Sequence, residues 1–182
     1  MVDEVKYQVL ASYDDVEVRR YPRIVLASVD GEDANDAFGL LFRYISGKNE
    51  KSDKIAMTAP VITDEPRGKS IAMTAPVIRQ ERRMSFVMPS ELDLKDVPRP
   101  LDDSVRIDEI PERVLAVTRF RGYAREKDVK QRTRSLLDVA TKQRLKVIGE
   151  PFNMFYNSPF SPGFMRRNEV AVEIEWDLTS IF

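Results

Sequence analysis

The chain has 182 residues, a length that suits a single domain, with 29 basic side chains, 30 acidic side chains and a net charge of −1. This balance gives the whole molecule no net attraction to nucleic acid or to anionic lipid. The chain contains no cysteine and no histidine, which excludes thiolate nucleophiles, disulfides and zinc–thiolate sites, and removes imidazole as a general base or as an iron ligand.

The N-terminal residues MVDEVKYQVL lack the basic region and the apolar run of a signal peptide. No stretch of the sequence approaches the eighteen apolar residues that a membrane-spanning helix needs. We therefore expect a cytoplasmic protein without a membrane span and, most simply, a monomer. The absence of cysteine agrees with a reducing compartment.

The chain opens with a pattern that is typical of strands. Apolar side chains alternate with polar ones over residues 7–11 and again over residues 16–21, where Pro22 ends the run. Residues 24–29 form a nearly continuous apolar run that stops at Gly31. These three segments predict three successive strands.

A helix is predicted next, because apolar residues recur there at helical spacing. Asp33 or Asn35 is the candidate N-cap and Gly47 the candidate stop. The residues expected on its apolar side are Ala37, Phe38, Leu41, Phe42 and Ile45.

The sequence IAMTAPVI occurs twice, at residues 55–62 and 71–78. Pro66 and Gly68 lie between the two copies, which predicts two strands joined by a turn. Residues 84–89 predict one more short strand.

The motif of residues 16–27 returns at residues 105–116, and a helix is expected after each copy. The second helix is predicted over residues 125–143, with inward-facing Val129, Thr133, Leu136, Leu137 and Ala140. Strands are expected after it, at residues 151–157 and 169–176. We interpret the pattern as one domain over residues 1–182, built from two half-repeats at about 13–89 and 102–177, with a ligand cleft near the pseudo-twofold axis.

No catalytic set is evident. R-G-K-S at residues 67–70 lacks the first glycine of a phosphate loop, and no G-x-S-x-G is present. The acidic pairs at 14–15 and 102–103 are typical of turns. The acidic residues at the alternate positions 173, 175 and 177 are typical of the solvated face of a strand. We therefore predict no catalytic residues, no protein metal site and no enzymatic activity.

Residues 125–146 carry eight basic side chains: Arg125, Lys127, Lys130, Arg132, Arg134, Lys142, Arg144 and Lys146. The preferred interpretation is a solvated helix face, because no aromatic residues interleave with the charges. A surface for nucleic acid or anionic lipid is the alternative. We expect no specific nucleic-acid partner.

Large apolar residues mark two candidate walls of a cleft. Phe38, Leu41 and Phe42 fall on the first helix, and Phe160, Phe164 and Met165 fall in a loop shaped by prolines and a glycine. Ordinary core packing is one explanation for these residues. A lid over an apolar ligand is the other, because loops are normally polar.

Five segments together resemble the SOUL haem-binding protein family: V-E-V-R-R-Y at 16–21, L-F-R-Y-I-S-G at 41–47, K-I-A-M-T-A-P-V at 54–61, S-F-V-M-P at 85–89 and R-R-N-E-V at 166–170. The resemblance extends from about residue 13 to residue 176. It implies an α+β fold in which two helices flank a distorted antiparallel β-barrel, built from a pseudo-symmetric repeat and similar to bacterial effector-binding domains.

The resemblance also implies non-covalent binding of haem or another tetrapyrrole, in a groove between the first helix and the loop at residues 157–165. By position, Phe38 and Phe42 correspond to apolar groove residues and Arg43 to a basic residue that faces a propionate. With the other cleft candidates, the predicted site contains Phe38, Leu41, Phe42, Arg43, Phe160, Phe164 and Met165. Two further basic positions of the family fall on the uncharged Asn35 and Ser161.

Haem, held without histidine, is the expected cofactor. Candidate iron ligands are Met57, Met73, Met154, Met165, Tyr44 and Tyr156, although methionine in a strand is more often core filler. The leading hypothesis is a tetrapyrrole carrier or buffer. Its alternatives are an effector-sensing or protein-interaction module that takes a different amphipathic molecule in the same cleft, and an enzyme that acts on tetrapyrroles.

Overall fold

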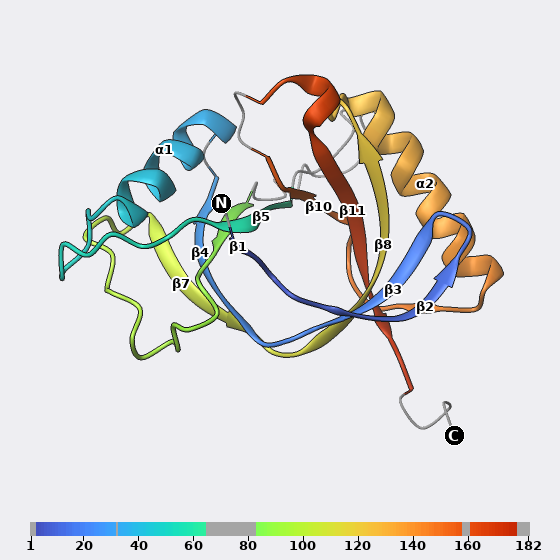
Figure 1. Cartoon of the computed structure of the whole chain (residues 1–182), viewed down its shortest axis with the longest axis horizontal. Coiled ribbons are helices and arrows are strands. Elements are labelled where there is room, and N and C mark those ends of the chain that lie inside the picture. Colours follow the sequence, from blue (N-terminus) through green and yellow to red (C-terminus); the bar gives the residue numbers. More distant parts are fainter. Residues whose placement is uncertain (1–2, 32, 65–82, 158–160, 178–182) are drawn as a thin grey trace, which may run out of the picture.

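The structure is a computed structural model that describes residues 3–31, 33–64, 83–157 and 161–177 (Figure 1). The strands of these residues are β1 (Asp3–Glu4), β2 (Gln8–Tyr13), β3 (Val16–Tyr21), β4 (Ile24–Asp30), β5 (Thr58–Asp64), β6 (Arg83–Val87), β7 (Val105–Ile110), β8 (Arg113–Arg121), β9 (Lys146–Val147), β10 (Phe152–Phe155) and β11 (Arg167–Glu175). The helices are α1 (Ala34–Ile45), α2 (Glu126–Lys142) and the single 3₁₀ turn η1 (Gly163–Met165).

The strands join one sheet in the order β2-β3-β8-β11-β10-β5-β6-β4-β7, with β1 paired to β5 and β9 paired to β11 outside this path. All described pairings are antiparallel except that of β1 with β5. No described pairing joins β2 to β7, whereas a barrel needs a neighbour on both sides of every strand. The α+β class with two flanking helices is therefore confirmed, and the expected closed barrel is wrong, because the curved sheet stays open.

The strand order is symmetric about the pairing of β10 with β5. Reading outward on one side gives β10, β11, β8 and β3, and on the other side β5, β6, β4 and β7. Each side carries one helix, which follows β8 or β4 in the chain. Figure 1 shows the two helices on opposite sides of the molecule, with the curved sheet between them.

Helix α1 begins at the predicted cap. The Asp33 carboxylate accepts hydrogen bonds from the backbone N–H groups of Asn35 and Asp36 at 2.9 and 3.0 Å, which satisfies two of the unpaired donors of the first turn. Asn35 is therefore not the cap. The helix ends before Gly47, whose φ of +111° favours glycine. It packs on β4, β6 and β7 through Ala37, Leu41, Tyr44 and Ile45.

Helix α2 also lies where its periodicity predicts it. Val129, Leu136 and Ala140 are buried against β8 and β11, and Thr133 and Leu137 are half-buried beside them. The opposite side of α2 is exposed and carries most of its charge, as an amphipathic helix requires. In the described ranges, neither helix is long and apolar enough to cross a membrane.

A third core cluster packs on the other face of the sheet, away from both helices. It includes Tyr21, Leu26, Ile62, Val87, Leu115, Val117, Phe152, Met154 and Ala171. Side chains alternate between the two faces of a strand. The residues of these strands that point to the opposite face therefore contribute to the core clusters under α1 and α2. The sheet is thus covered on both faces.

Most strands occupy the segments that the sequence patterns predict, including β6 near residues 84–89 and β10 and β11 after the second helix. The first copy of IAMTAPVI contributes β5 from Thr58 onward. The second copy, at residues 71–78, lies outside the described residues, so the hairpin between the copies stays a prediction.

Candidate functional site

The aromatic flank of α1, which we define as Phe38 and Phe42, carries a stacked pair of rings. Their centroids are 6.1 Å apart and their planes differ by 11°. Phe38 is half-buried because it also meets the Phe86 ring of β6, edge to face, at 5.3 Å. Phe42 is 51% exposed. The pair therefore forms an aromatic surface that is backed by the core and open to solvent at one end.

Arg43 follows directly on the solvent side of α1 and is exposed. Arg43 is thus next to the aromatic flank in the chain, on the side of the helix that borders a hollow. Of the seven binding residues that the sequence predicts, Phe38 and Phe42 pack together on this helix, and Arg43 lines a hollow on its other flank. Leu41 does not join them at the surface. Its side chain is fully buried in the core beneath α1, because it lies on the face of the helix that packs against the sheet.

The loop residues of the predicted site lie elsewhere. Phe164 and Met165 belong to η1, which contacts β8, and their side chains are 78% and 60% exposed. Figure 1 shows η1 beside the N-terminal end of α2. Phe160 lies outside the described residues. The predicted groove between α1 and the loop at residues 157–165 stays a prediction, because residues 158–160 lie outside the described residues.

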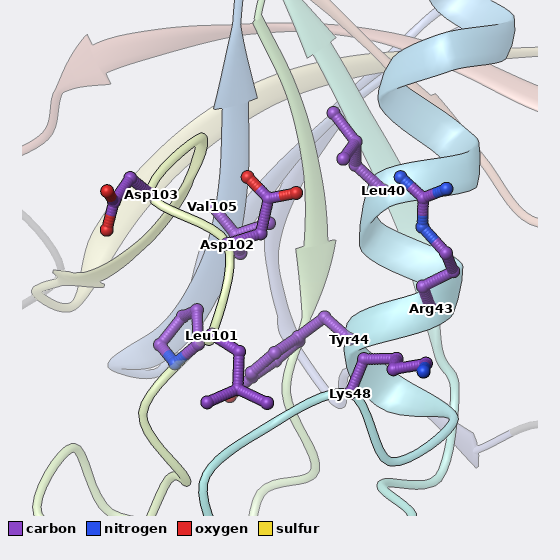
Figure 2. Close-up of a pocket in the computed structure, with 9 residues that line it drawn as sticks. Leu40, Arg43, Tyr44, Lys48, Leu101, Asp102, Asp103 and Val105 are labelled. Atoms are coloured by element: carbon purple, nitrogen blue, oxygen red, sulfur yellow. The ribbon is translucent and has the colours of Figure 1, made fainter.

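A hollow of about 530 Å³ lies on the other flank of α1, facing the segment that leads into β7 (Figure 2). Its lining combines apolar side chains with two cations and two carboxylates, among them Leu40, Leu101, Val105, Arg43, Lys48, Asp102 and Asp103. The pKa of Asp102 lies below its usual value, chiefly because the Ser104 backbone N–H donates to the carboxylate at 2.9 Å. The two carboxylates balance the two cations, so this hollow offers no net positive charge to an anionic ligand.

Most of the candidate iron ligands are occupied or buried. The Tyr44 hydroxyl donates to the Pro98 carbonyl at 2.6 Å, and burial raises the pKa of Tyr44 to about 12. Met154 is buried in the core, while Met57 is half-buried and Met165 is exposed. Met73 lies outside the described residues. In the described ranges, no cluster of three or more carboxylates is arranged to hold a metal ion.

A buried charged cluster on the other face of the sheet was not foreseen from the sequence. Glu169 of β11 is fully buried, and its carboxylate accepts from Arg19 at 2.8 Å, from Tyr156 at 2.8 Å and from Arg119 at 3.0 Å. Arg167 adds two further contacts at 3.2 Å. Arg19 is itself only 1% exposed. The sequence feature that could have indicated this cluster is the pair of charged strand motifs V-E-V-R-R-Y and R-R-N-E-V, which place ionisable side chains at inward positions.

The cluster holds Glu169 ionised. Burial alone would raise the pKa of Glu169, but the hydrogen bond and charge of Arg19, together with Tyr156 and Arg167, outweigh it and leave the pKa below the usual value. The pKa of Tyr156 is raised, chiefly because the side chain is buried and to a smaller extent because of the nearby Tyr21 and Glu169. Tyr156 therefore stays a protonated donor to Glu169, and it offers no phenolate to an iron atom at neutral pH.

Comparison with known sequences relates the chain to proteins named for haem. A family model described as SOUL heme-binding protein matches residues 2–67 and 63–173. Heme-binding protein 2 of Homo sapiens is 33% identical over 162 residues, which cover 85% of this chain and 75% of that protein. Heme-binding protein 2 of Mus musculus is 31% identical over 165 residues, with the same coverage of 85% and 75%.

Comparison with solved structures identifies the fold. The C-terminal domain of EcmrR superposes with a TM-score of 0.62 at 10% identity, covering 94% of this chain and 99% of that domain. A protein described as a hydrolase from Listeria innocua has a TM-score of 0.58 at 8% identity, covering 91% of this chain and 94% of the other. At such low identity these matches establish a common architecture and nothing about activity.

Proposed function

Because this chain belongs to the SOUL heme-binding protein family, we propose that it binds haem or a related tetrapyrrole non-covalently on the aromatic flank of α1. The observation that carries the proposal is the stacked ring pair with Phe42 half exposed, followed in the chain by the exposed Arg43. The role we propose is that of a carrier or buffer.

The flank suits the ligand for physical reasons. A porphyrin is a flat apolar ring system with two anionic arms, so it gains free energy by stacking on aromatic side chains. Burying roughly 100 Å² of apolar surface on each partner contributes about 2–3 kcal/mol per partner before association costs are subtracted. Arg43 supplies a cation at the edge, where a propionate can accept two parallel hydrogen bonds.

Iron coordination is not required by this proposal. Phe38, Phe42 and Arg43 would hold the macrocycle through its ring and its carboxylates, which metal-free porphyrins share with haem. Bound iron would supply redox and axial-ligand chemistry, but the chain has no histidine to act as a ligand. We accordingly propose binding and not catalysis.

Titration of the purified protein with hemin and with metal-free protoporphyrin IX, followed by absorbance, tests the proposal. We expect saturable binding of both, with similar affinities, because the ring and the propionates carry the interaction. If neither porphyrin gives a saturable spectral change, the proposal is wrong. Much tighter binding of hemin would instead show that iron coordination dominates.

Matched variants locate the ligand on α1. Phe42→Ser removes the exposed ring and should weaken both porphyrins about tenfold or more. Leu101→Ser is its control, because Leu101 is an even more exposed apolar residue, at 64%, in the hollow on the opposite flank. If Leu101→Ser lost affinity for the porphyrins and Phe42→Ser did not, the result would indicate that the ligand binds in that hollow and not on the aromatic flank.

The charge is tested in the same way. Arg43→Glu should weaken both porphyrins, because it replaces the partner of a propionate with a repelling carboxylate. Arg134→Glu makes the same change on the exposed side of α2 and should leave affinity unchanged. Equal effects of the two variants would mean that only the net charge of the protein matters, and would remove Arg43 from the site.

A further inference from the structure

Three apolar or aromatic side chains stand exposed together at the start of α2. Phe164 and Met165 of η1 are 78% and 60% exposed, and Tyr123, which follows β8, is 54% exposed. We call these three residues the η1 knob. Figure 1 shows η1 at one end of the molecule, beside the N-terminal end of α2 and away from the C-terminal part of α1. Large exposed apolar side chains in a cluster mark a surface that meets a partner.

The knob is built into the fold and is not a frayed loop. Gly163 packs so closely on Tyr123 that a Cβ atom would lie 2.3 Å from the ring. The Arg166 guanidinium lies 4.8 Å from the centre of the same ring. The Asn168 side chain, which is buried, donates to the Gly122 carbonyl at 2.8 Å and ties the segment to β11. The backbone therefore holds Phe164 and Met165 outward.

The surface around the knob is basic. Arg121, Arg125 and Lys127 are exposed, and none of them makes an ion pair with any described residue. A hollow of about 310 Å³ next to Tyr123 is lined partly by Arg121, Arg125 and Arg132. Nearby acidic side chains are fewer: Asp128 lines the hollow, Glu126 pairs with Lys130, and Asp15 pairs with Arg132 at 3.3 Å. This local excess of positive charge contrasts with the net charge of −1 of the whole chain.

We propose that the η1 knob and its basic surroundings form a docking surface for anionic lipid bilayers. Protruding apolar side chains within a basic rim are suited to insertion at the acyl boundary while the arginines meet lipid phosphates. The charge is complementary to an anionic membrane surface, and the knob projects instead of forming a groove for a protein segment. This inference is independent of the proposed function, because the aromatic flank of α1 contributes nothing to it.

Vesicle co-sedimentation tests the surface directly. We expect the full-length protein to bind vesicles of phosphatidylcholine mixed with phosphatidylserine, and not vesicles of phosphatidylcholine alone. High salt should weaken the binding, because it screens the attraction between the basic rim and the anionic headgroups. Failure to bind the mixed vesicles at low salt would overturn the proposal, and would leave an acidic protein as the partner for this surface.

Two sets of variants test the two halves of the surface. The double variant Phe164→Ser/Met165→Ser should lose about tenfold or more in vesicle partition, since it removes the inserting side chains. The double variant Arg121→Glu/Arg125→Glu should lose at least about fivefold for each changed residue. Phe42→Ser and Arg134→Glu are the matched controls on α1 and on the exposed side of α2. Equal losses in variants and controls would overturn the proposal.

A spectroscopic measurement separates insertion from a defect in folding. In Phe164→Trp an indole replaces an exposed ring, so the core of the protein is untouched. On addition of mixed vesicles its emission, measured as the difference from the native protein with its single Trp176, should shift to shorter wavelength, and lipids brominated in the acyl chains should quench it. Vesicle binding without either change would mean that the knob stays in water, which contradicts the proposed insertion.

Discussion

Replacing Glu169 with glutamine should destabilise the protein strongly, because it removes the fully buried carboxylate that pairs with Arg19 and leaves only the 40% exposed Glu17 beside that guanidinium among the described residues. Arg19 and Glu169 are 1% and 0% exposed, and their charged atoms lie 2.8 Å apart. The substitution keeps the size and shape of the side chain. It therefore changes the charge of the cluster while it leaves the packing of β11 intact.

The magnitude follows from the contacts of the carboxylate. Glu169 accepts from Arg19, Tyr156 and Arg119 at 2.8–3.0 Å, and from Arg167 at 3.2 Å. Only Arg119, whose side chain is 46% exposed, can turn toward water without rearrangement of the core. Removal of one partner of a buried ion pair typically costs about 3–5 kcal/mol. Glu17 stays paired with Arg19 at 2.7 Å, which places the expected loss at the lower end of that range. That loss is a large fraction of the 5–15 kcal/mol that stabilises a typical domain, so the variant should be near its unfolding threshold at about 25 °C.

Urea unfolding, followed by far-ultraviolet circular dichroism, measures the loss. Glu175→Gln is the matched control on the same strand, because Glu175 is exposed and, among the described residues, pairs only with the exposed Lys146. We expect the control to change stability by less than about 0.5 kcal/mol. A loss below about 1 kcal/mol in Glu169→Gln would refute the reasoning, since it would mean that Arg19 finds water or another partner when the carboxylate is gone.

Three further predictions follow from the same structure. The folded-state pKa of Glu169 is lowered from its usual value of 4.5. The stability that its ionised carboxylate contributes is therefore complete above pH 4.5 and is lost as the pH falls through the folded-state pKa. Urea midpoints measured on acidification should fall more steeply in the native protein than in Glu169→Gln. Leu41→Ala should lower the free energy of unfolding in urea by about 2–5 kcal/mol, because it empties a fully buried site. Phe42→Ala, one residue later, should lower it by less than about 1 kcal/mol. Similar losses of stability in both variants would contradict the burial difference. Asp33→Ala should lower stability by about 1 kcal/mol through loss of the α1 cap, and Asp33→Asn should restore most of it; no loss in Asp33→Ala would mean that the cap is not used.

The order of the elements was predictable because it depends on local periodicity. Val16 and Val18 alternate with charged residues and form the inner face of β3, and Pro22 ends that strand as expected. The spacing of the apolar residues predicted the buried side of α1 at Ala37, Leu41 and Ile45, whereas Phe42, expected on the same side, is 51% exposed. Each of these features follows from which residues share a face of a strand or helix, and that is decided within a few residues.

The candidate site was predictable only in part. The resemblance to the family indicated Phe38, Phe42 and Arg43 on the first helix; all three lie on α1, where the two rings stack and Arg43 lines the hollow on the other flank. It also implied that the loop with Phe164 and Met165 forms the other wall of a groove beside that helix; η1 contacts β8 near α2, and the groove itself stays a prediction. The position of a loop depends on the strands that it connects and on what it packs against, here Tyr123, so sequence spacing alone does not locate it.

By itself, the sequence determined the family, the absence of histidine and cysteine chemistry, and the strands and helices with their inner faces. Only the tertiary structure decided that the sheet stays open, and that Glu169 is buried although it shares its strand face with the more accessible Glu173 and Glu175. Alternation shows that the three carboxylates point the same way, but it does not show which part of that face is covered. The curvature of the sheet covers Glu169 and brings to it Arg19, 150 residues away along the chain.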